Sequence, residues 1–405
     1  MTIGKTNSSA IPSIRLALVA SLIVLATGCV SEFKPGGNSN LILPDEEQME
    51  TIHRMDDFDG TSMAAMTSLT TAFQVKRLGG VEFNGATLPL VSFTDGGHIA
   101  TQTGRPPSAR LLTGNASNRT EGMSVAVYRL DGPGGPQRTG QSDDGILLGR
   151  NGNQNGFLVE RPNTDGSRSI GMASWIDGNI DWIIDDGNVN AFGWVSQSGR
   201  IVFSSRRVED SNFVIAVRET DGSRWDIEET LPYTWMFPVF EADGQSIFAV
   251  RLGDGYADMT HGSLSSANDF RDTMKSHRMS NRTDATRISQ MVSTSTSGPK
   301  GNGLVIPWYS YELGRMVVWD VDRLEVQLLP EGSVSAFPMD TKRNWLVTTG
   351  EGLDRTALFV SDRAEDRLID FPWLARHMSG NQVFIIEPLD RVIKVAMIEF
   401  GSATE

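Results

Sequence analysis

The 405-residue sequence predicts an all-β fold, a β-propeller of six to eight blades with seven favoured, and one short helical insertion. Three observations lead to this fold class. A motif of two strands and a turn recurs at a spacing of 45 residues, short strand patterns follow one another along most of the chain, and turn residues separate them. Repeats of roughly 40 to 50 residues, each several strands long, are typical of propeller blades.

The recurring motif is clearest in residues 192–203 and 237–248. Each segment begins with an aromatic-headed strand, continues with a polar turn that ends in glycine, and closes with a strand of β-branched and aromatic residues. Gly199 and Gly244 occupy the same turn position. A third copy covers residues 337–347, with Asn344 at or near the position of the turn glycine. Sheets of the same design are therefore expected to follow one another along the chain.

Strand and turn patterns predict six units between about residue 88 and residue 370. Besides the motif copies, strands are expected at 156–160, 169–173, 181–184, 212–219, 225–228, 303–308, 315–320, 325–328, 345–349, 356–361 and 367–370, after a weaker unit over 90–130. A last pair of strands, 382–387 and 392–400, lacks two partners. Residues 66–83 are expected to supply them, so that both chain ends build a seventh blade. Closure of this kind removes exposed sheet edges.

The sequence around these turns resembles the Asp-Gly-centred repeat of TolB-like and WD40-like propellers. The resemblance is best in residues 241–248, with Asp243 and Gly244 at the turn, and in residues 198–203. It implies a fold and no activity. TolB proteins carry an additional N-terminal α/β domain, and residues 30–88 are too few to build it. The resemblance therefore implies nothing about partners.

One region interrupts the strand rhythm. A helical insertion is expected over about residues 256–286, where Ser266 to Asp269 resembles a capping box and Phe270, Met274 and His277 follow at helical spacing. Two roles are open for this helix. It either packs its apolar side on the adjacent blade or forms a lid or partner-binding element on one face of the propeller.

The first 29 residues resemble the signal of a bacterial lipoprotein. Lys5 and Arg15 form a basic head before an apolar run over residues 16–26, which is too short for a spanning helix of roughly 20 residues. The run ends in Leu25-Ala26-Thr27-Gly28-Cys29, which resembles a lipobox. The resemblance implies cleavage after residue 28 and lipidation of Cys29, and Val30 in place of aspartate points to the outer membrane. The alternative is an ordinary secretory signal with a chance cysteine.

Residues 29–49 are rich in Gly, Asn, Ser and Pro and predict a flexible tether, so that residues 50–405 form the propeller. Lys+Arg number 36 against 50 Asp+Glu, and removal of Lys5 and Arg15 with the signal changes the net charge from −14 to −16. This charge disfavours nucleic acid, which binds through cationic contacts to phosphate. Cys29 is the single cysteine, so no intramolecular disulfide is expected.

No catalytic motif is evident in the sequence, and no cofactor or metal is expected. The five histidines show no spacing typical of a zinc site, and there is no phosphate-binding loop or nucleophile elbow. The segment from Asp177 to Asp181 begins like a calcium loop, but it lacks the glycine and the distal glutamate that such a loop needs. A hairpin turn accounts for it better.

An aromatic cluster is the one candidate binding site in the propeller. Trp308, Tyr309 and Tyr311 stand at the end of a predicted strand, where a loop emerges, and such side chains suit a sugar or a peptide. Because successive residues of a strand face opposite sides, Trp308 and Tyr309 are expected to point apart. Packing between blades is the competing role for all three.

Two hypotheses follow for the function. The first is a membrane-anchored envelope lipoprotein whose propeller is a non-catalytic platform for an unknown envelope protein or glycan. The alternative is a propeller hydrolase or lyase that acts on extracellular polysaccharide, with carboxylates from several blades around the central channel. The fold does not decide between them.

Overall fold

The computed structural model describes residues 62–65, 72–84, 89–92, 97–105, 122–132, 134–143, 145–147, 152–227, 233–241, 244–253, 255–281, 305–321, 323–338, 345–350, 356–360, 365–369, 374–379, 382–388 and 391–400. The predicted signal peptide over residues 1–28, Cys29 and the predicted tether over residues 29–49 lie outside the described residues. Within the described part, the first strand begins at Ser62 and the last ends at Phe400.

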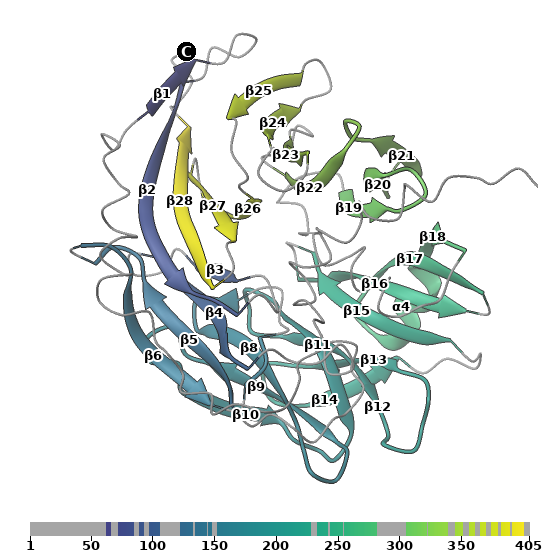
Figure 1. Ribbon diagram of the computed structural model, residues 1–405. Helices are drawn as coiled ribbons and strands as arrows, with labels where there is room; N and C mark the ends of the chain where they lie inside the picture. The colour runs from purple at the N-terminus through teal and green to yellow at the C-terminus, as the bar shows by residue number, and fades with distance from the viewer. Residues whose placement is uncertain are drawn as a thin grey trace, which may run out of the picture.

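The fold is an all-β propeller. Its antiparallel sheets follow one another around a ring, as Figure 1 shows. The first sheet along the ring contains β3 (Leu90–Ser92), β4 (His98–Gly104), β5 (Met123–Arg129) and β6 (Gln137–Asp143). The second sheet, β7–β14, is described below. The third sheet contains β15 (Thr234–Phe240), β16 (Ser246–Gly253), β17 (Tyr256–Ser263) and β18 (Lys275–Ser280). The fourth contains β19 (Val305–Ser310), β20 (Arg315–Asp320) and β21 (Glu325–Leu328), and the fifth contains β22 (Ser333–Pro338), β23 (Trp345–Thr349), β24 (Thr356–Val360) and β25 (Glu365–Ile369).

The remaining sheet in the middle of the chain joins two four-stranded units. One unit contains β7 (Gly152–Asn153), β8 (Gly156–Pro162), β9 (Arg168–Ala173) and β10 (Ile180–Ile184), and the other contains β11 (Val189–Val195), β12 (Ile201–Arg206), β13 (Val214–Arg218) and β14 (Arg224–Ile227). They are joined by one parallel pair, Val189 with Arg168. The described strands thus divide into seven groups, and whether each group is a complete blade stays a prediction.

Both ends of the chain build the sheet that closes the ring. Its strands are β1 (Ser62–Ala65), β2 (Ala72–Glu82), β28 (Val392–Phe400), β27 (Gln382–Pro388) and β26 (Leu374–Ser379), in that order. The register of β2 with β28 runs from Phe73 opposite Phe400 to Glu82 opposite Val392. The expectation that N-terminal strands complete the last C-terminal sheet is confirmed, and β2 lies within the predicted range 66–83. The other N-terminal strand, β1, lies before that range, and the third C-terminal strand, β26, was not predicted. Because β2 occupies the edge of β28, that edge is not left open.

The two best copies of the sequence motif share a backbone feature. Phe192 in β11 and Phe237 in β15 both have positive φ angles, 61° and 55°, and each lies within a register shift of its strand pair. A residue with a side chain rarely adopts this conformation, so a shared bulge is strong support for the predicted repeat. Their ring centroids are 4.3 Å apart, and the two rings belong to one buried cluster between neighbouring sheets.

The expected helical insertion is smaller than predicted. Of the described residues 256–281, Ala267–Thr273 form the helix α4, and the flanking residues form the strands β17 and β18. The sequence of β17 lacks the alternation of apolar residues that predicts a strand, because its buried polar residues have partners in both neighbouring strands. Asp258 accepts hydrogen bonds from Arg251 at 3.1 Å and from Arg278 at 2.7 Å. Paired polar side chains can be buried in a central strand, so an alternation of apolar residues is not needed there.

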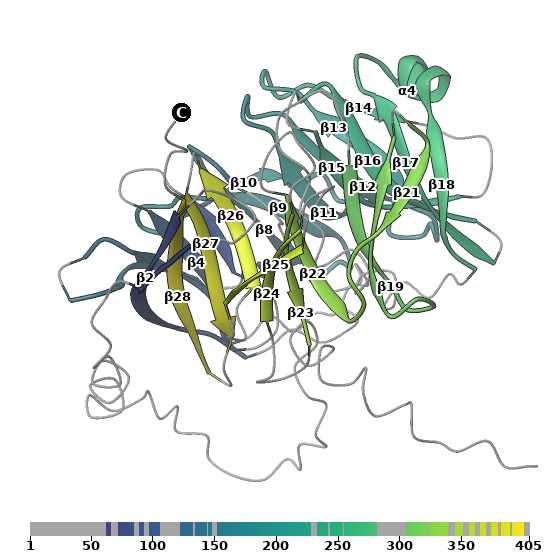
Figure 2. The same cartoon turned by 90° about the horizontal axis from the view of Figure 1, so that it is seen from above.

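The start of the helix is as predicted. Ser266 is the N-cap, and its Oγ accepts a hydrogen bond from the backbone N of Asp269 at 3.0 Å. Phe270 is fully buried and its ring lies 5.7 Å from that of Trp235. Burial of such a side chain contributes about 2 kcal/mol. His277 lies in β18 and not on the helix. The helix packs beside β14 and β17, and Figure 2 shows it at the upper right of the molecule.

Candidate functional site

An open cavity of about 450 Å³ lies where the closing sheet meets the β3–β6 sheet. This volume is within the range of small-ligand and peptide side-chain pockets, roughly 300–1,000 Å³. The cavity is lined by residues of β2, β27 and β28 on one side and of the β5–β6 turn on the other: Lys76, Arg77, Leu78, Gly97, Leu130, Asp131, Gly132, Gly135, Gln382, Phe384 and Met397. It therefore combines residues from the two ends of the chain.

A β-bulge in β2 shapes one wall. The register of β2 against β28 shifts between Arg77 and Gly79, so Leu78 is the extra residue. Gly79 has a φ of +123°, and a Cβ atom there would lie 2.6 Å from Cδ of Pro136. Only glycine meets both conditions without strain. A bulge bends its strand and changes the direction of the side chains next to it. The bulge at Leu78 therefore sets the course of the strand that forms this wall of the cavity.

The opposite wall is the turn between β5 and β6. Gly134 and Gly135 both have positive φ angles, and the backbone N of Gly135 donates to the carbonyl of Gly132 at 3.1 Å. The backbone N of Leu130 donates to the carbonyl of Gly97 at 2.9 Å, which fixes the turn against the start of β4. Gly97, Gly132 and Gly135 line this side of the cavity, and none of them places a side chain in it.

The floor of the cavity is apolar. Leu130 and Phe384 are each 3% exposed and belong to the buried cluster between the two sheets, and Leu78 and Met397 pack against that cluster while partly exposed. The floor is thus a continuation of the core. Because the core beneath it is packed, an apolar group that enters the cavity loses contact with water without displacing protein atoms.

The rim of the cavity carries positive charge. Lys76 and Arg77 are exposed at the end of the cavity formed by β2. The one carboxylate in the lining, Asp131, accepts a hydrogen bond from Nη2 of Arg129 at 2.9 Å. The hydrogen bonds from Arg129 hold the pKa of Asp131 below its ordinary value, so this carboxylate is ionised and already neutralised at neutral pH. On a protein with a net charge of −14, this rim favours a ligand with an acidic group.

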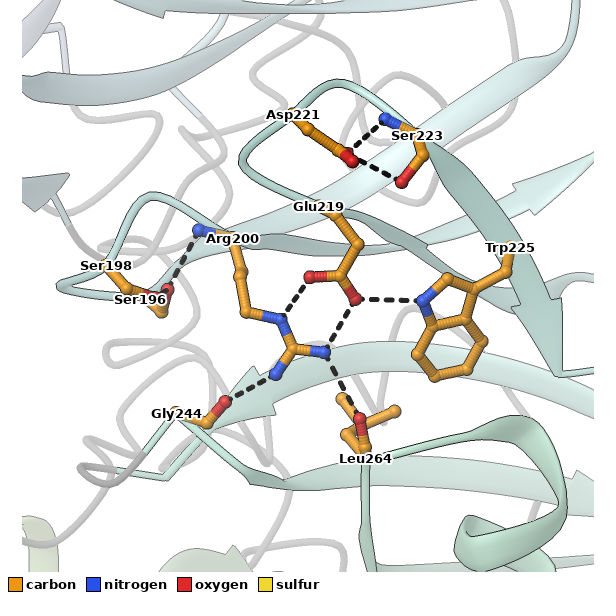
Figure 3. Close-up of polar contacts among 9 residues, drawn as sticks. All are labelled: Ser196, Ser198, Arg200, Glu219, Asp221, Ser223, Trp225, Gly244 and Leu264. Atoms are coloured by element: carbon orange, nitrogen blue, oxygen red, sulfur yellow. Dashed lines mark hydrogen bonds and ion pairs between the residues drawn. The ribbon is translucent and has the colours of Figure 1, made fainter.

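A group of polar side chains around Arg200 joins two neighbouring sheets, and the hydrogen-bond donors of Arg200 are already occupied by the protein. Arg200 reaches from the turn of one motif copy to the turn of the next, as Figure 3 shows. Its Nε and Nη2 donate to Glu219 at 2.8 and 2.9 Å, its Nη1 donates to the carbonyl of Gly244 at 2.8 Å, and its Nη2 also donates to the carbonyl of Leu264 at 3.2 Å. Trp225 Nε1 donates to Glu219 at 2.9 Å. We call this group the Arg200 clamp.

The clamp shows how the turn of one copy of the sequence motif contacts the next copy. The hydrogen bonds from Arg200 hold the pKa of Glu219 below its ordinary value. Because Arg200 donates to four acceptors of the protein, it is a structural tie between the β11–β14 and β15–β18 units and not a binding group.

A buried ion pair lies at the join within the eight-stranded sheet. Arg168 Nε lies 2.8 Å from Glu160 Oε2, with both side chains fully or almost fully buried. The other oxygen of Glu160 accepts from the backbone N of Phe192 at 2.7 Å, at the bulge with positive φ. Burial raises the pKa of Glu160 and lowers that of Arg168. The pair connects β8 and β9 with β11.

The predicted aromatic cluster does not form one surface. Trp308 is 2% exposed and lies in the core between the β15–β18 and β19–β21 sheets, where its ring is 5.7 Å from that of His277. Tyr309 packs in a different cluster, on the other side of β19, which confirms that the two residues point apart. Tyr311 is partly buried and meets Tyr309 edge to face at 5.1 Å. A ligand role for Tyr309 and Tyr311 stays a prediction, whereas the ring of Trp308 is covered by the core.

No three His, Cys, Asp or Glu side chains of the described ranges lie close enough to hold a metal ion. The segment at Asp177 is a hairpin turn, as predicted. The carboxylate of Asp177 accepts from the backbone N of Asn179 at 3.1 Å, and Gly178 has a φ of +73°.

The cavity itself was not predicted from the sequence. Two signals for it are present in hindsight: the pair Gly79-Gly80 inside a strand pattern, which is typical of a bulge, and the run of glycine and proline over residues 132–136. Neither signal shows that the two segments meet.

The chain matches no protein-family model, and no curated protein is significantly similar to it. Among solved structures, it is similar in fold to TolB from Acinetobacter baumannii, with 13% identity over 73% of this chain and 79% of that chain and a TM-score of 0.37. It is also similar to the β-propeller domain of the Trilobed protease from Pyrococcus furiosus, with 9% identity over 79% and 95% of the two chains and a TM-score of 0.45.

The chain resembles TolB-like propellers. A third similar structure is the putative TolB from Agrobacterium tumefaciens, with 15% identity over 53% of this chain and 76% of that chain and a TM-score of 0.36. At these identities and scores the likeness extends to the fold alone. In the described part of the chain, no helix has the length and apolar character that crossing a membrane requires.

Proposed function

We propose that this chain is a lipid-anchored envelope protein whose propeller binds an extended segment of a partner protein, without catalysis, in the cavity between the closing sheet and the β5–β6 turn. The observation that carries the proposal is the cavity itself, which has an apolar floor, a rim with two cations and a wall lined by glycines. Pockets with a mainly apolar lining and a few placed polar groups are the usual binding sites of proteins.

The lining favours a peptide segment over a glycan. An apolar side chain of the partner fits the floor at Leu78 and Met397, and a neighbouring carboxylate fits the rim at Lys76. Sugars stack on exposed aromatic faces, but the one aromatic side chain in the lining, Phe384, is 3% exposed. The expected ligand is therefore an apolar residue beside an acidic residue in an extended chain.

The anchor would place this cavity near a membrane. Lipidation of Cys29 would hold the chain permanently, since a diacylglyceryl group with a further acyl chain binds far more strongly than one chain. A flexible tether of the 21 residues 29–49 has an r.m.s. length of about 25 Å. The propeller would then search a thin layer beside the membrane for its partner. An outer-membrane location remains part of this proposal.

The binding site is tested by photo-cross-linking in cells that produce the full chain. A photoreactive amino acid at Gln382, in the cavity lining, is expected to give an adduct with a specific envelope protein. The matched position is Val208, which is 42% exposed and lies in the turn after β12. The adduct from position 382 should be lost with Lys76→Glu and kept with Lys76→Arg. Equal adducts from both positions, or none from position 382, would contradict the proposed site.

A second assay distinguishes the proposed function from the alternative that the sequence left open, a hydrolase or lyase that acts on polysaccharide. Purified protein is incubated with a set of extracellular polysaccharides, and new reducing or unsaturated ends are measured. We expect no products. Sustained product formation would replace the non-catalytic proposal.

The anchor has its own test. Cys29→Ser is expected to move the protein from the detergent phase to the aqueous phase in Triton X-114 partitioning, because it removes the acceptor of the lipid. Unchanged partitioning would show that no lipid is attached at residue 29.

A further inference from the structure

The first described strand begins beside the cavity. The register of β1 with β2 places Ser62 opposite Val75, and the next residue of β2, Lys76, lines the cavity. Antiparallel strands run in opposite directions, so a chain that continues β1 in this register brings residue 61 opposite Lys76. The residues that precede the described part of the chain are therefore attached to the propeller at the rim of the cavity.

Three of the side chains that line the cavity form one row across the closing sheet. Lys76 stands opposite Met397 in β28, and Met397 stands opposite Phe384 in β27. Residues directly opposite each other in a sheet lie on the same face. A continuation of β1 would add residue 61 to this row, next to Lys76.

The segment before β1 has the composition that the cavity favours. Its last seven residues are Met55, Asp56, Asp57, Phe58, Asp59, Gly60 and Thr61. They carry three carboxylates and no basic side chain, opposite in charge to Lys76 and Arg77 at the rim. Phe58 stands between two aspartates, which is the apolar residue beside an acidic residue expected of a ligand. Gly60 allows the chain to turn from β1 toward the cavity.

The segment is long enough for Phe58 to reach the apolar floor. The sheet order is β1, β2, β28, and neighbouring strands lie about 4.8 Å apart, so β28 is roughly 10 Å from the line of β1. The three residues from 61 to 58 span roughly 10 Å when extended. With residue 61 beside Lys76, Asp59 comes within reach of the Lys76 ammonium group and Phe58 within reach of Met397.

We propose that residues 55–61 of this chain dock in the cavity, with Phe58 on the apolar floor at Met397 and the aspartates at the basic rim. A segment attached at the rim has an effective concentration on the order of millimolar, so weak contacts are enough to hold it. The second part of the proposal rests on the proposed function. The partner must displace residues 55–61, so its apparent affinity is lower than its affinity for the empty cavity.

The docking is tested by photo-cross-linking from position 58 in the purified full chain, without a partner. Benzoylphenylalanine in place of Phe58 keeps an aromatic side chain and reacts with neighbouring C–H groups. We expect an adduct within one chain between the tryptic peptides 55–76 and 395–405, the second of which contains Met397. Lys76→Glu should abolish this adduct, and Lys76→Glu combined with Asp59→Lys should restore it, because the charges are again opposite.

The control for these charge reversals is Arg207→Glu, at an exposed position that is not in the cavity lining, which should leave the adduct unchanged. Circular dichroism checks that each variant is folded. The docking is overturned if position 58 gives no adduct, or links to another part of the propeller, to a second copy or to a different protein. It is also overturned if the adduct survives Lys76→Glu.

The displacement is tested with the photoreactive residue at Gln382 in cells. Replacing the three aspartates of residues 55–61 by asparagine removes the charge of the competing segment. We expect the adduct from position 382 with the envelope protein to increase about threefold or more. An adduct that forms but does not increase would overturn the competition and leave the proposed function standing. If position 382 gives no partner adduct while position 58 still links to 395–405, the proposed function fails and the docking stands.

Discussion

The junction held by the Arg200 clamp and the junction that holds the cavity are built in opposite ways. Between the β11–β14 and β15–β18 units, large buried side chains such as Trp235 and Phe240 fill the space, and Arg200 donates to four acceptors across it. Between the closing sheet and the β3–β6 sheet, an open cavity of about 450 Å³ remains above the packed core.

The difference follows from where the residues come from. The tight junction joins consecutive copies of one motif, so a residue next to one turn glycine reaches the turn glycine of the next copy, as Arg200 reaches Gly244. The open junction joins residues about 300 positions apart, such as Lys76 and Gln382, with no repeat to match their surfaces. The cavity that we propose as the partner site therefore lies where the repeat pattern ends.

The largest expected effect is on the tight junction. Arg200→Met retains the aliphatic stem but leaves Glu219 with Trp225 as its remaining donor and removes the donors to Gly244 and Leu264. We expect the free energy of unfolding to fall by about 3 kcal/mol, measured by urea denaturation. Arg207→Met, at an exposed position of the same region, is the control and should change it by less than about 0.5 kcal/mol. Equal effects would show that the clamp does not stabilise the junction.

A smaller effect is expected at the open junction. Gly79→Ala places a Cβ in a positive-φ conformation and within 2.6 Å of Pro136, and should lower the free energy of unfolding by about 2 kcal/mol. Gly134→Ala has a φ of +96° but meets no atom within 4 Å, so it measures the conformational strain alone, about 1 kcal/mol. If the two substitutions have the same effect in urea denaturation, contact with Pro136 does not shape the bulge.

The clamp also predicts a dependence on pH. The pKa of Glu219 is held below its ordinary value of 4.5 in the folded protein, so its ionised form stabilises the fold above that value and the contribution is lost as the pH falls through the lowered pKa. Because the side chain is 29% exposed, we expect a contribution of about 1 kcal/mol. The stability difference between the wild type and Glu219→Gln should be full at pH 7 and shrink in acid. A difference that is constant over this range would contradict the assignment.

The smallest effect on stability, with the clearest effect on binding, is expected at the rim. Lys76→Glu reverses an exposed charge and should change the free energy of unfolding by less than about 0.5 kcal/mol. Binding of the partner should nevertheless weaken at least tenfold in a pull-down titration, because a carboxylate on the partner then meets a like charge. Unchanged binding would place the partner elsewhere on the propeller.

The repeat and its closure were accessible from the sequence because they depend on local patterns. The strands near residues 156–160, 325–328 and 392–400 were predicted from alternation and turn residues, and the closing role of residues 66–83 followed from counting the strands that the last unit lacks. The pattern failed at Tyr256–Ser263, where Asp258 and Thr260 are buried by pairing with polar partners across the sheet. Such pairing depends on tertiary contacts and leaves no periodic signal.

By itself the sequence determined the fold class, the turn positions and the cap at Ser266, because these depend on residues close together in the chain. It also carries the predictions for Cys29 and the tether. Only the tertiary structure decided that Trp308 is covered, that Arg200 ties two units, and that Leu78 faces a turn near residue 132. The physical reason is that a cavity is defined by surfaces that fail to fill the space between them, and the fit of surfaces from distant segments cannot be derived from either segment alone.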